Sequence, residues 1–227
     1  MNSPQTFRIK SFGCQMNAYD GERMAELLSD QGMRAVADGE DADLVVLNTC
    51  HIREKAAEKA YSDVGRLRRE DGSKPLIALA GCVAQAEGEE ARTRSKMIDM
   101  VVGPQAYHRL PQMVAEAAAG RPSIDTDMPA ISKFDALPQR RRTGVSAFLS
   151  VQEGCDKFCT YCVVPYTRGA EISRPARDIL TEAQQLVDGG AREITLLGQN
   201  VNAWADESFG GLATLIRALA GIKGVER

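Results

Sequence analysis

Residues 147–162 read AFLSVQEGCDKFCTYC, an apolar run followed at once by three closely spaced cysteines. The apolar run over 147–151 predicts a strand, which is followed by a cysteine-rich loop. Cys155, Cys159 and Cys162 then fall within eight residues. A strand that ends in a loop of three thiols is typical of a metal-binding group at the edge of a sheet. This stretch therefore determines how the carboxy-terminal part of the chain is interpreted.

The three cysteines favour an iron–sulfur cluster over a zinc site. A structural zinc site has four ligands, and His51 and His108 are both distant in the sequence. Three thiolates suit a [4Fe–4S] cluster whose fourth iron stays open, and the open iron can bind S-adenosylmethionine (SAM). The spacing Cys-x-x-x-Cys-x-x-Cys is the signature of radical SAM enzymes. A zinc or ferredoxin-like loop, or a group of reactive thiols, is the alternative.

Upstream of this loop, residues 1–119 alternate apolar runs with helical patterns. Repeated βα units predict an α/β fold, in which an open, mostly parallel sheet is covered by helices. Residues 120–144 contain three prolines and few apolar residues, which indicates a linker. A second βα series occupies residues 145–227 and is interpreted as the start of a (β/α) barrel. The apolar runs of the first part predict strands at Phe7–Phe12, Leu44–Leu47 and Leu76–Ala80.

Each of these three strands is followed by one cysteine. Cys14, Cys50 and Cys82 are far apart in the sequence, and a lone cysteine is more often a small buried apolar residue than a ligand. However, the carboxyl ends of parallel strands share one edge of a sheet, where ligands bind in open α/β folds. The three thiols can therefore converge on a second cluster, and a helix start after each cysteine would stabilise thiolates.

Composition narrows the class of protein. The chain has 227 residues and a formal net charge of −3, so it lacks the basic footprint of a protein that binds nucleic acid with its whole surface. No apolar run is long enough to span a membrane, and residues 1–10 are polar, unlike a signal peptide. We therefore expect a cytoplasmic protein. Its thiols would stay reduced there, which favours metal or redox chemistry over disulfides.

Several short stretches resemble the radical SAM methylthiotransferase family, and the resemblance covers nearly the whole chain. Gln15–Asp20 and Ile52–Lys55 are most similar to the bacterial tRNA branch of this family, the MiaB type. The other branches act on threonylcarbamoyl-adenosine in tRNA or on a ribosomal protein. The matching stretches are Gly13–Asn17, Asn48–Cys50, Gly81–Cys82, Glu153–Gly169 and Leu196–Asn202.

The resemblance implies two [4Fe–4S] clusters with different roles. Cys155, Cys159 and Cys162 would hold the cluster that cleaves SAM. An auxiliary cluster, which supplies or carries sulfur, would be held by Cys14, Cys50 and Cys82. The reaction would convert isopentenyl-adenosine next to the tRNA anticodon to its 2-methylthio derivative. Because the C–H bond at carbon 2 of adenine is aromatic and unactivated, radical chemistry is required and no acid–base pair is assigned.

The resemblance also implies contacts to SAM and several partners. Tyr161 stands where this superfamily usually has an aromatic residue near the adenine of SAM. Gly198, Gln199 and Asn200 occupy the place of the Gly-Gly-Glu segment that holds the SAM amino group in many radical SAM enzymes. The expected partners are a tRNA substrate and an electron donor such as flavodoxin or ferredoxin. We expect a monomer with no membrane association.

From Ser146 to Arg227 the chain has room for about two βα units, by the usual length of such units. The barrel of the family has several more, followed by a small β-domain, so we expect a truncated radical SAM core that is inactive alone. Two alternative functions remain at this point. One is methylthiolation of threonylcarbamoyl-adenosine tRNA or of a ribosomal protein, and the other is a non-catalytic iron–sulfur electron-transfer module. Reductive cleavage of SAM to 5′-deoxyadenosine distinguishes an enzyme from such a module.

Overall fold

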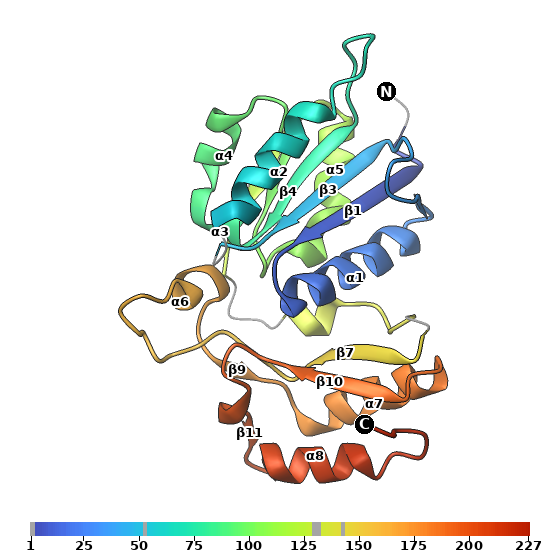
Figure 1. The fold of residues 1–227 in the computed structure, drawn as a ribbon, viewed down its shortest axis with the longest axis vertical. Coiled ribbons are helices and arrows are strands. Elements are labelled where there is room, and N and C mark those ends of the chain that lie inside the picture. Colours follow the sequence, from blue (N-terminus) through green and yellow to red (C-terminus); the bar gives the residue numbers. More distant parts are fainter. Residues whose placement is uncertain (1–2, 52–53, 129–132, 142–143) are drawn as a thin grey trace. The chain divides into compact units, whose positions relative to one another are not determined.

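A computed structural model describes residues 3–51, 54–128, 133–141 and 144–227 (Figure 1). The chain forms two compact units, an amino-terminal unit over Met1–Pro138 and a carboxy-terminal unit over Gln139–Arg227. Two residues of the Ile52–Lys55 stretch, at positions 52 and 53, lie outside the described residues. No helix in the part of the chain that the structure describes is long and apolar enough to cross a membrane.

The amino-terminal unit is built on one parallel sheet of six strands in the order β2-β1-β3-β4-β5-β6. All five pairings are parallel, as the repeated βα pattern predicts. The central strands are continuous apolar runs because helices bury both faces of the sheet. The strands are β1 (Thr6–Phe12), β2 (Arg34–Ala35), β3 (Leu44–Thr49), β4 (Leu76–Gly81), β5 (Met100–Val102) and β6 (Ser123–Asp125).

Successive residues of the central strands enter two different cores, since side chains alternate across a strand. Val46 and Ala78 pack on one face with α1 (Gln15–Asp30) and α5 (Leu110–Ala118). Val45 and Ile77 pack on the other face. Figure 1 shows the helices that cover this second face. They are α2 (Glu54–Arg66), α3 (Cys82–Glu87) and α4 (Glu89–Arg94).

Three local features differ from the sequence prediction. The segment 120–144, predicted to be a linker, contains β6, which extends the sheet by pairing with β5. This strand is three residues long, too short for a period-2 pattern to be visible. The helix expected after β4 is broken in two at Gly88, whose φ of +51° ends the first turns. Finally, asparagine is a common N-cap residue, so the sequence predicts a helix that begins after Asn17, but α1 begins at Gln15 with Cys14 as its N-cap.

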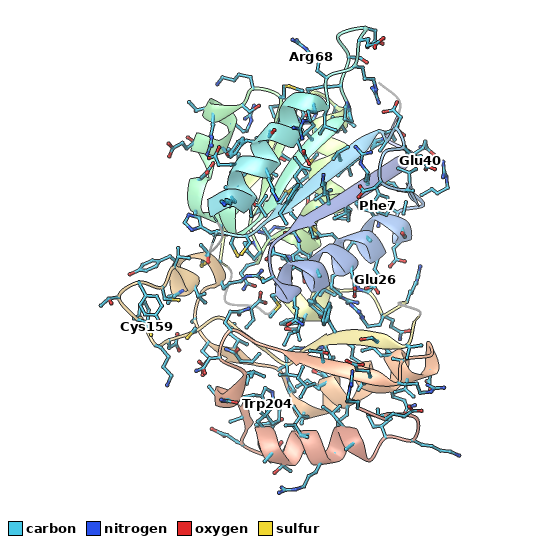
Figure 2. The ribbon with its side chains drawn as sticks, viewed as in Figure 1. Phe7, Glu26, Glu40, Arg68, Cys159 and Trp204 are labelled. Atoms are coloured by element: carbon cyan, nitrogen blue, oxygen red, sulfur yellow. The ribbon has the colours of Figure 1, made fainter. Side chains whose placement is uncertain are left out.

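The carboxy-terminal unit contains the two predicted parallel strands, β7 (Ser146–Ser150) and β10 (Glu193–Leu197). A two-residue strand, β8 (Gln152–Glu153), continues from β7 and pairs antiparallel with β9 (Ile172–Ser173). The core is centred on the buried Trp204, which is labelled in Figure 2. The helices of this unit are α6 (Val164–Arg168), α7 (Ala176–Asp188) and α8 (Leu212–Ala220).

The outer edge of β10 is where a following barrel strand would pair. The sequence predicts an unpaired edge there, but the Ile194 amide donates to the Arg227 carbonyl oxygen at 2.8 Å. Ile194 and Leu196 also line an apolar groove of about 200 Å³ with Ile216 and Leu219. The last described residue therefore already lies along β10 as a neighbouring strand would.

Candidate metal centres

Three neighbouring strands of the amino-terminal sheet end in register. Phe12 on β1 is paired with Thr49 on β3, and Thr49 is paired with Gly81 on β4. Cys50 and Cys82 follow directly after their strands, and Cys14 follows β1 after one intervening glycine. Because neighbouring strands lie about 4.8 Å apart, this register places the three cysteines side by side at the carboxyl edge.

Gly13 brings Cys14 close to Cys50. Its φ of +130° is one that side-chain-bearing residues rarely adopt. A Cβ added at Gly13 would lie 2.2 Å from Cys50 Cβ and 3.2 Å from Cys50 Sγ. The backbone that precedes Cys14 therefore lies directly against the side chain of Cys50, and only glycine leaves room for that approach.

Beneath the cysteines lies a pair of asparagines that the sequence analysis did not assign to the site. Asn17 and Asn48 are both fully buried. The Cys14 thiol donates to Asn17 Oδ1 at 3.1 Å, and Asn17 Nδ2 donates to Asn48 Oδ1 at 3.2 Å. Asn48 Nδ2 donates in turn to the Asn17 carbonyl oxygen at 2.7 Å. The sequence does hold a sign of this pair, because each asparagine lies within three positions of a cysteine near the end of an apolar run.

The three thiols fit a cluster in chemistry and position. Cys50 and Cys82 are buried and Cys14 is exposed, so the set spans from the sheet to the surface. Cys14 is the N-cap of the 16-residue helix α1, whose dipole favours a thiolate. None of the six cysteines is joined in a disulfide. Nothing in this donor set conflicts with an iron–sulfur cluster, for which thiolates are the usual ligands.

The second cysteine set lies on a loop between β8 and α6. Figure 2 labels Cys159 on this loop. Cys159 is exposed and Cys155 and Cys162 are half-buried, so all three thiols can be reached from outside. The Cys162 amide donates to the Cys159 carbonyl oxygen at 2.9 Å, which forms a tight turn between these two residues. Phe158 has a φ of +47° within the same loop.

The base of this loop is closed by the backbone. The Cys155 amide donates to the Gly169 carbonyl oxygen at 3.2 Å. Gly154 has a φ of +75°, and a Cβ added there would lie 1.8 Å from the Ala170 carbonyl oxygen. The returning chain after α6 therefore packs directly on the residue before Cys155.

A buried ion pair, also not predicted from the sequence, joins the two ends of the loop. Arg168 Nη1 lies 2.8 Å from Glu153 Oε1, and both side chains are about 3% exposed. The loop tip is polar and open, whereas its two ends are joined by a charged pair removed from water. Because breaking a buried pair costs about 3–5 kcal/mol, this contact holds the ends of the loop together.

The residues predicted to contact SAM have different surroundings. The Tyr161 side chain is 90% exposed and lies between two of the cysteines in sequence. Gly198, Gln199 and Asn200 follow β10, beside the base of the cysteine loop. Gln199 Oε1 accepts a hydrogen bond from the Gly154 amide at 2.6 Å, and Asn200 Nδ2 donates to Glu171 Oε2 at 3.1 Å. Both amide side chains are thus engaged by residues of the loop and its return.

A single-ion site is not formed by either set. Among the described residues, no three His, Cys, Asp or Glu side chains lie close enough to hold one metal ion. A cluster separates its thiolate ligands by more than one ion does, since irons and sulfides lie between them. The thiols of each set are brought together by strand ends or by a short loop, and in both sets a glycine allows close backbone packing.

Two family models match this chain, one for each unit. The model described as "Uncharacterized protein family UPF0004" matches residues 6–103, which contain Cys14, Cys50 and Cys82. The model of the radical SAM superfamily matches residues 149–225, which contain the three-cysteine loop. Each cysteine set thus lies in its own matched region.

Curated relatives are similar over nearly all of this chain. A tRNA-2-methylthio-N(6)-dimethylallyladenosine synthase of Novosphingobium aromaticivorans is 73% identical over 222 residues, covering 96% of this chain and 50% of the relative. The enzyme of the same name from Zymomonas mobilis is 69% identical, covering 100% of this chain and 52% of the relative. The chain spans about half the length of the curated relatives it matches.

Solved structures with the same fold have low sequence identity. The cobalamin-dependent SAM radical enzyme OxsB matches with a TM-score of 0.63 at 10% identity, covering 96% of this chain and 37% of that one. The radical SAM methyltransferase TsrM from Kitasatospora setae matches with a TM-score of 0.59 at 14% identity, covering 95% and 50%. At these identities the likeness shows the fold alone, which is an open α/β sheet followed by a second α/β unit.

Proposed function

We propose that the protein containing this chain, a homologue of the amino-terminal half of the radical SAM methylthiotransferases, converts N6-isopentenyl-adenosine in tRNA to its 2-methylthio derivative. One observation carries the proposal. The register of β1, β3 and β4 brings three cysteines to one sheet edge, in a chain that also has the Cys155–Cys162 loop of radical SAM enzymes. Two sets of three thiols are what a reaction with two clusters needs.

The two sets of cysteines would hold two clusters with different roles. Cys155, Cys159 and Cys162 would hold the [4Fe–4S] cluster whose open iron binds SAM, and the exposed loop tip leaves SAM access to it. The second [4Fe–4S] cluster would be held by Cys14, Cys50 and Cys82. When bound, these groups supply reductive SAM cleavage and a site for sulfur. The buried Glu153–Arg168 pair keeps the loop in place without taking part in the chemistry.

SAM itself would lie beside the loop. Tyr161 is exposed and free to stack on an adenine ring. Gly198, Gln199 and Asn200 would contact SAM mainly through their backbone groups, because the amide side chains of the latter two already bond the loop region. The reaction also needs a tRNA substrate and a cytoplasmic electron donor such as flavodoxin or ferredoxin.

The proposal is tested by mass spectrometry of tRNA nucleosides from a bacterial strain that lacks its own methylthiotransferase gene. Expression of the whole protein should restore 2-methylthio-isopentenyl-adenosine, and a form with Cys155, Cys159 and Cys162 changed to Ala should not. Residues 1–227 alone should also fail, since the relatives have about as much chain again. Restoration of a methylthiolated threonylcarbamoyl-adenosine instead would establish the alternative substrate.

A further inference from the structure

Two glutamine side chains, the buried Gln152 and the half-buried Gln199, form hydrogen bonds with the backbone of Gly154, the residue before Cys155. Gln152 lies on β8 and is fully buried. Gln199 lies just after β10, on the other side of the loop base in sequence. Between them they bond both backbone groups of Gly154, and we call the two side chains together the glutamine clamp.

The two amides use opposite ends. Gln152 Nε2 donates to the Gly154 carbonyl oxygen at 2.6 Å and to the Glu153 carbonyl oxygen at 3.2 Å. Gln199 Oε1 accepts from the Gly154 amide at 2.6 Å. Gln152 therefore acts as a donor to the loop base and Gln199 as an acceptor from it.

The orientation of Gln152 is fixed at both ends of its amide. Its Oε1 accepts from the Asn200 amide at 3.0 Å while its Nε2 faces the two carbonyl oxygens. A Cβ added at Gly198 would lie 2.7 Å from this Oε1. The glycine thus leaves room for Gln152 to bridge the loop base and the segment after β10.

We propose that the glutamine clamp positions the cysteine loop for its cluster, with Gln152 and Gln199 acting on Cys155 through Gly154. A loop with its cysteines near the surface must keep three thiols at fixed separations, and the clamp fixes the first of them from both sides. The inference rests on the proposed function for the identity of the cluster. It assigns the Gln199 side chain to the protein backbone rather than to SAM.

Replacement of glutamine by glutamate should have different effects at the two positions. Gln199→Glu keeps an acceptor for the Gly154 amide, whereas Gln199→Met has a similar volume and no acceptor. Gln152→Glu would turn a carboxylate toward two carbonyl oxygens, and Gln152→Met would remove the donor without adding charge. A general loss of packing would affect the two positions alike. A difference between Gln199→Glu and Gln152→Glu is expected only if Gln199 accepts a hydrogen bond and Gln152 donates one.

The measurement is the rate at which a ferrous-iron chelator removes iron from the reconstituted whole protein that contains this chain. Cys14, Cys50 and Cys82 are changed to Ala so that only the loop cluster is loaded. We expect release to be about three- to tenfold faster for Gln199→Met and for both Gln152 variants, as loss of one or two net hydrogen bonds implies. Gln199→Glu should release iron at the parent rate.

Two controls separate positioning from a general loss of structure. The same four variants, made with Cys155, Cys159 and Cys162 changed to Ala, load only the auxiliary site, and its release rate should not change. In the metal-free chain, hydrogen exchange of the peptide that contains the Gly154 amide should be faster in Gln199→Met than in Gln199→Glu. This second readout does not depend on the cluster.

The outcomes are distinguishable. Equal release rates for Gln199→Met and Gln199→Glu, or equal acceleration at both cluster sites, would overturn the inference and leave the proposed function standing. A parent chain whose loop takes up no iron would overturn the proposed function and the inference with it.

Discussion

Replacing Gly13 by Ala tests whether the close packing of the Gly13 backbone on the Cys50 side chain is needed for the stability of the fold and for the cysteine site. The added Cβ would lie 2.2 Å from Cys50 Cβ, well inside the contact distance of about 3.5–4.0 Å. Cys50 or the Gly13 backbone must therefore move by more than about 1 Å. The added methyl overpacks the site at a cost of about 1–3 kcal/mol. The φ of +130° costs a further 1–3 kcal/mol or so for a residue with a side chain.

Gly39 provides the matched control. It has a φ of +91°, and nothing lies within 4 Å of its added Cβ. Gly39→Ala therefore has the backbone strain without the clash. Urea unfolding of the metal-free chain, followed by circular dichroism, should show Gly13→Ala less stable than Gly39→Ala by about 1–3 kcal/mol.

The same two variants should also differ in how much iron they bind. After anaerobic reconstitution, Gly13→Ala should lose the proposed auxiliary cluster, because the clash displaces Cys50 or the backbone before Cys14, while Gly39→Ala should keep it. If Gly13→Ala were no less stable than Gly39→Ala and bound the same amount of iron, the reasoning from the cysteine geometry would be refuted.

Two further predictions concern metal content and acid stability. The reconstituted chain should bind about eight iron and eight sulfide, as two [4Fe–4S] clusters require, and changing either cysteine set to Ala should remove about half; stoichiometric zinc without iron would contradict this. Asp206 accepts hydrogen bonds from the Ala176 amide and from Ser208, which hold its pKa below the ordinary value of 3.8. Because the folded-state pKa is depressed, this stabilisation is present above pH 3.8 and is lost as the pH falls through the lower value. Melting temperatures of the parent and Asp206→Asn should therefore differ at pH 7 and converge in acid, and a constant difference would exclude the ionised carboxylate as its cause.

The sequence predicted the sheet because its signal is local. The runs at Leu44–Leu47 and Leu76–Ala80 are strongly apolar and end two or three positions before a cysteine, and the structure confirms them as strands β3 and β4. The parallel order followed from alternation with helices. By contrast, β6 is three residues long within a proline-containing stretch, and only its pairing with β5 makes it a strand.

The supporting residues of the site could not be predicted in the same way. Asn17 suggested a helix cap, but the helix starts earlier and the side chain turns inward to Asn48. Gln152 and Gln199 are 47 positions apart, and their shared contact with Gly154 depends on β7 pairing with β10. Contacts of this kind form only in the tertiary structure, so they leave no periodic pattern in the sequence from which they could be predicted.

The two cysteine sets differ in how much of the chain each requires. Cys155, Cys159 and Cys162 lie within eight residues on one loop, so the chain keeps these three thiols near one another before any strands pair. Cys14, Cys50 and Cys82 come from three strand ends that are brought together only when β1, β3 and β4 have paired. A substitution that weakens the pairing of β1, β3 and β4 would therefore separate the amino-terminal thiols without changing any cysteine.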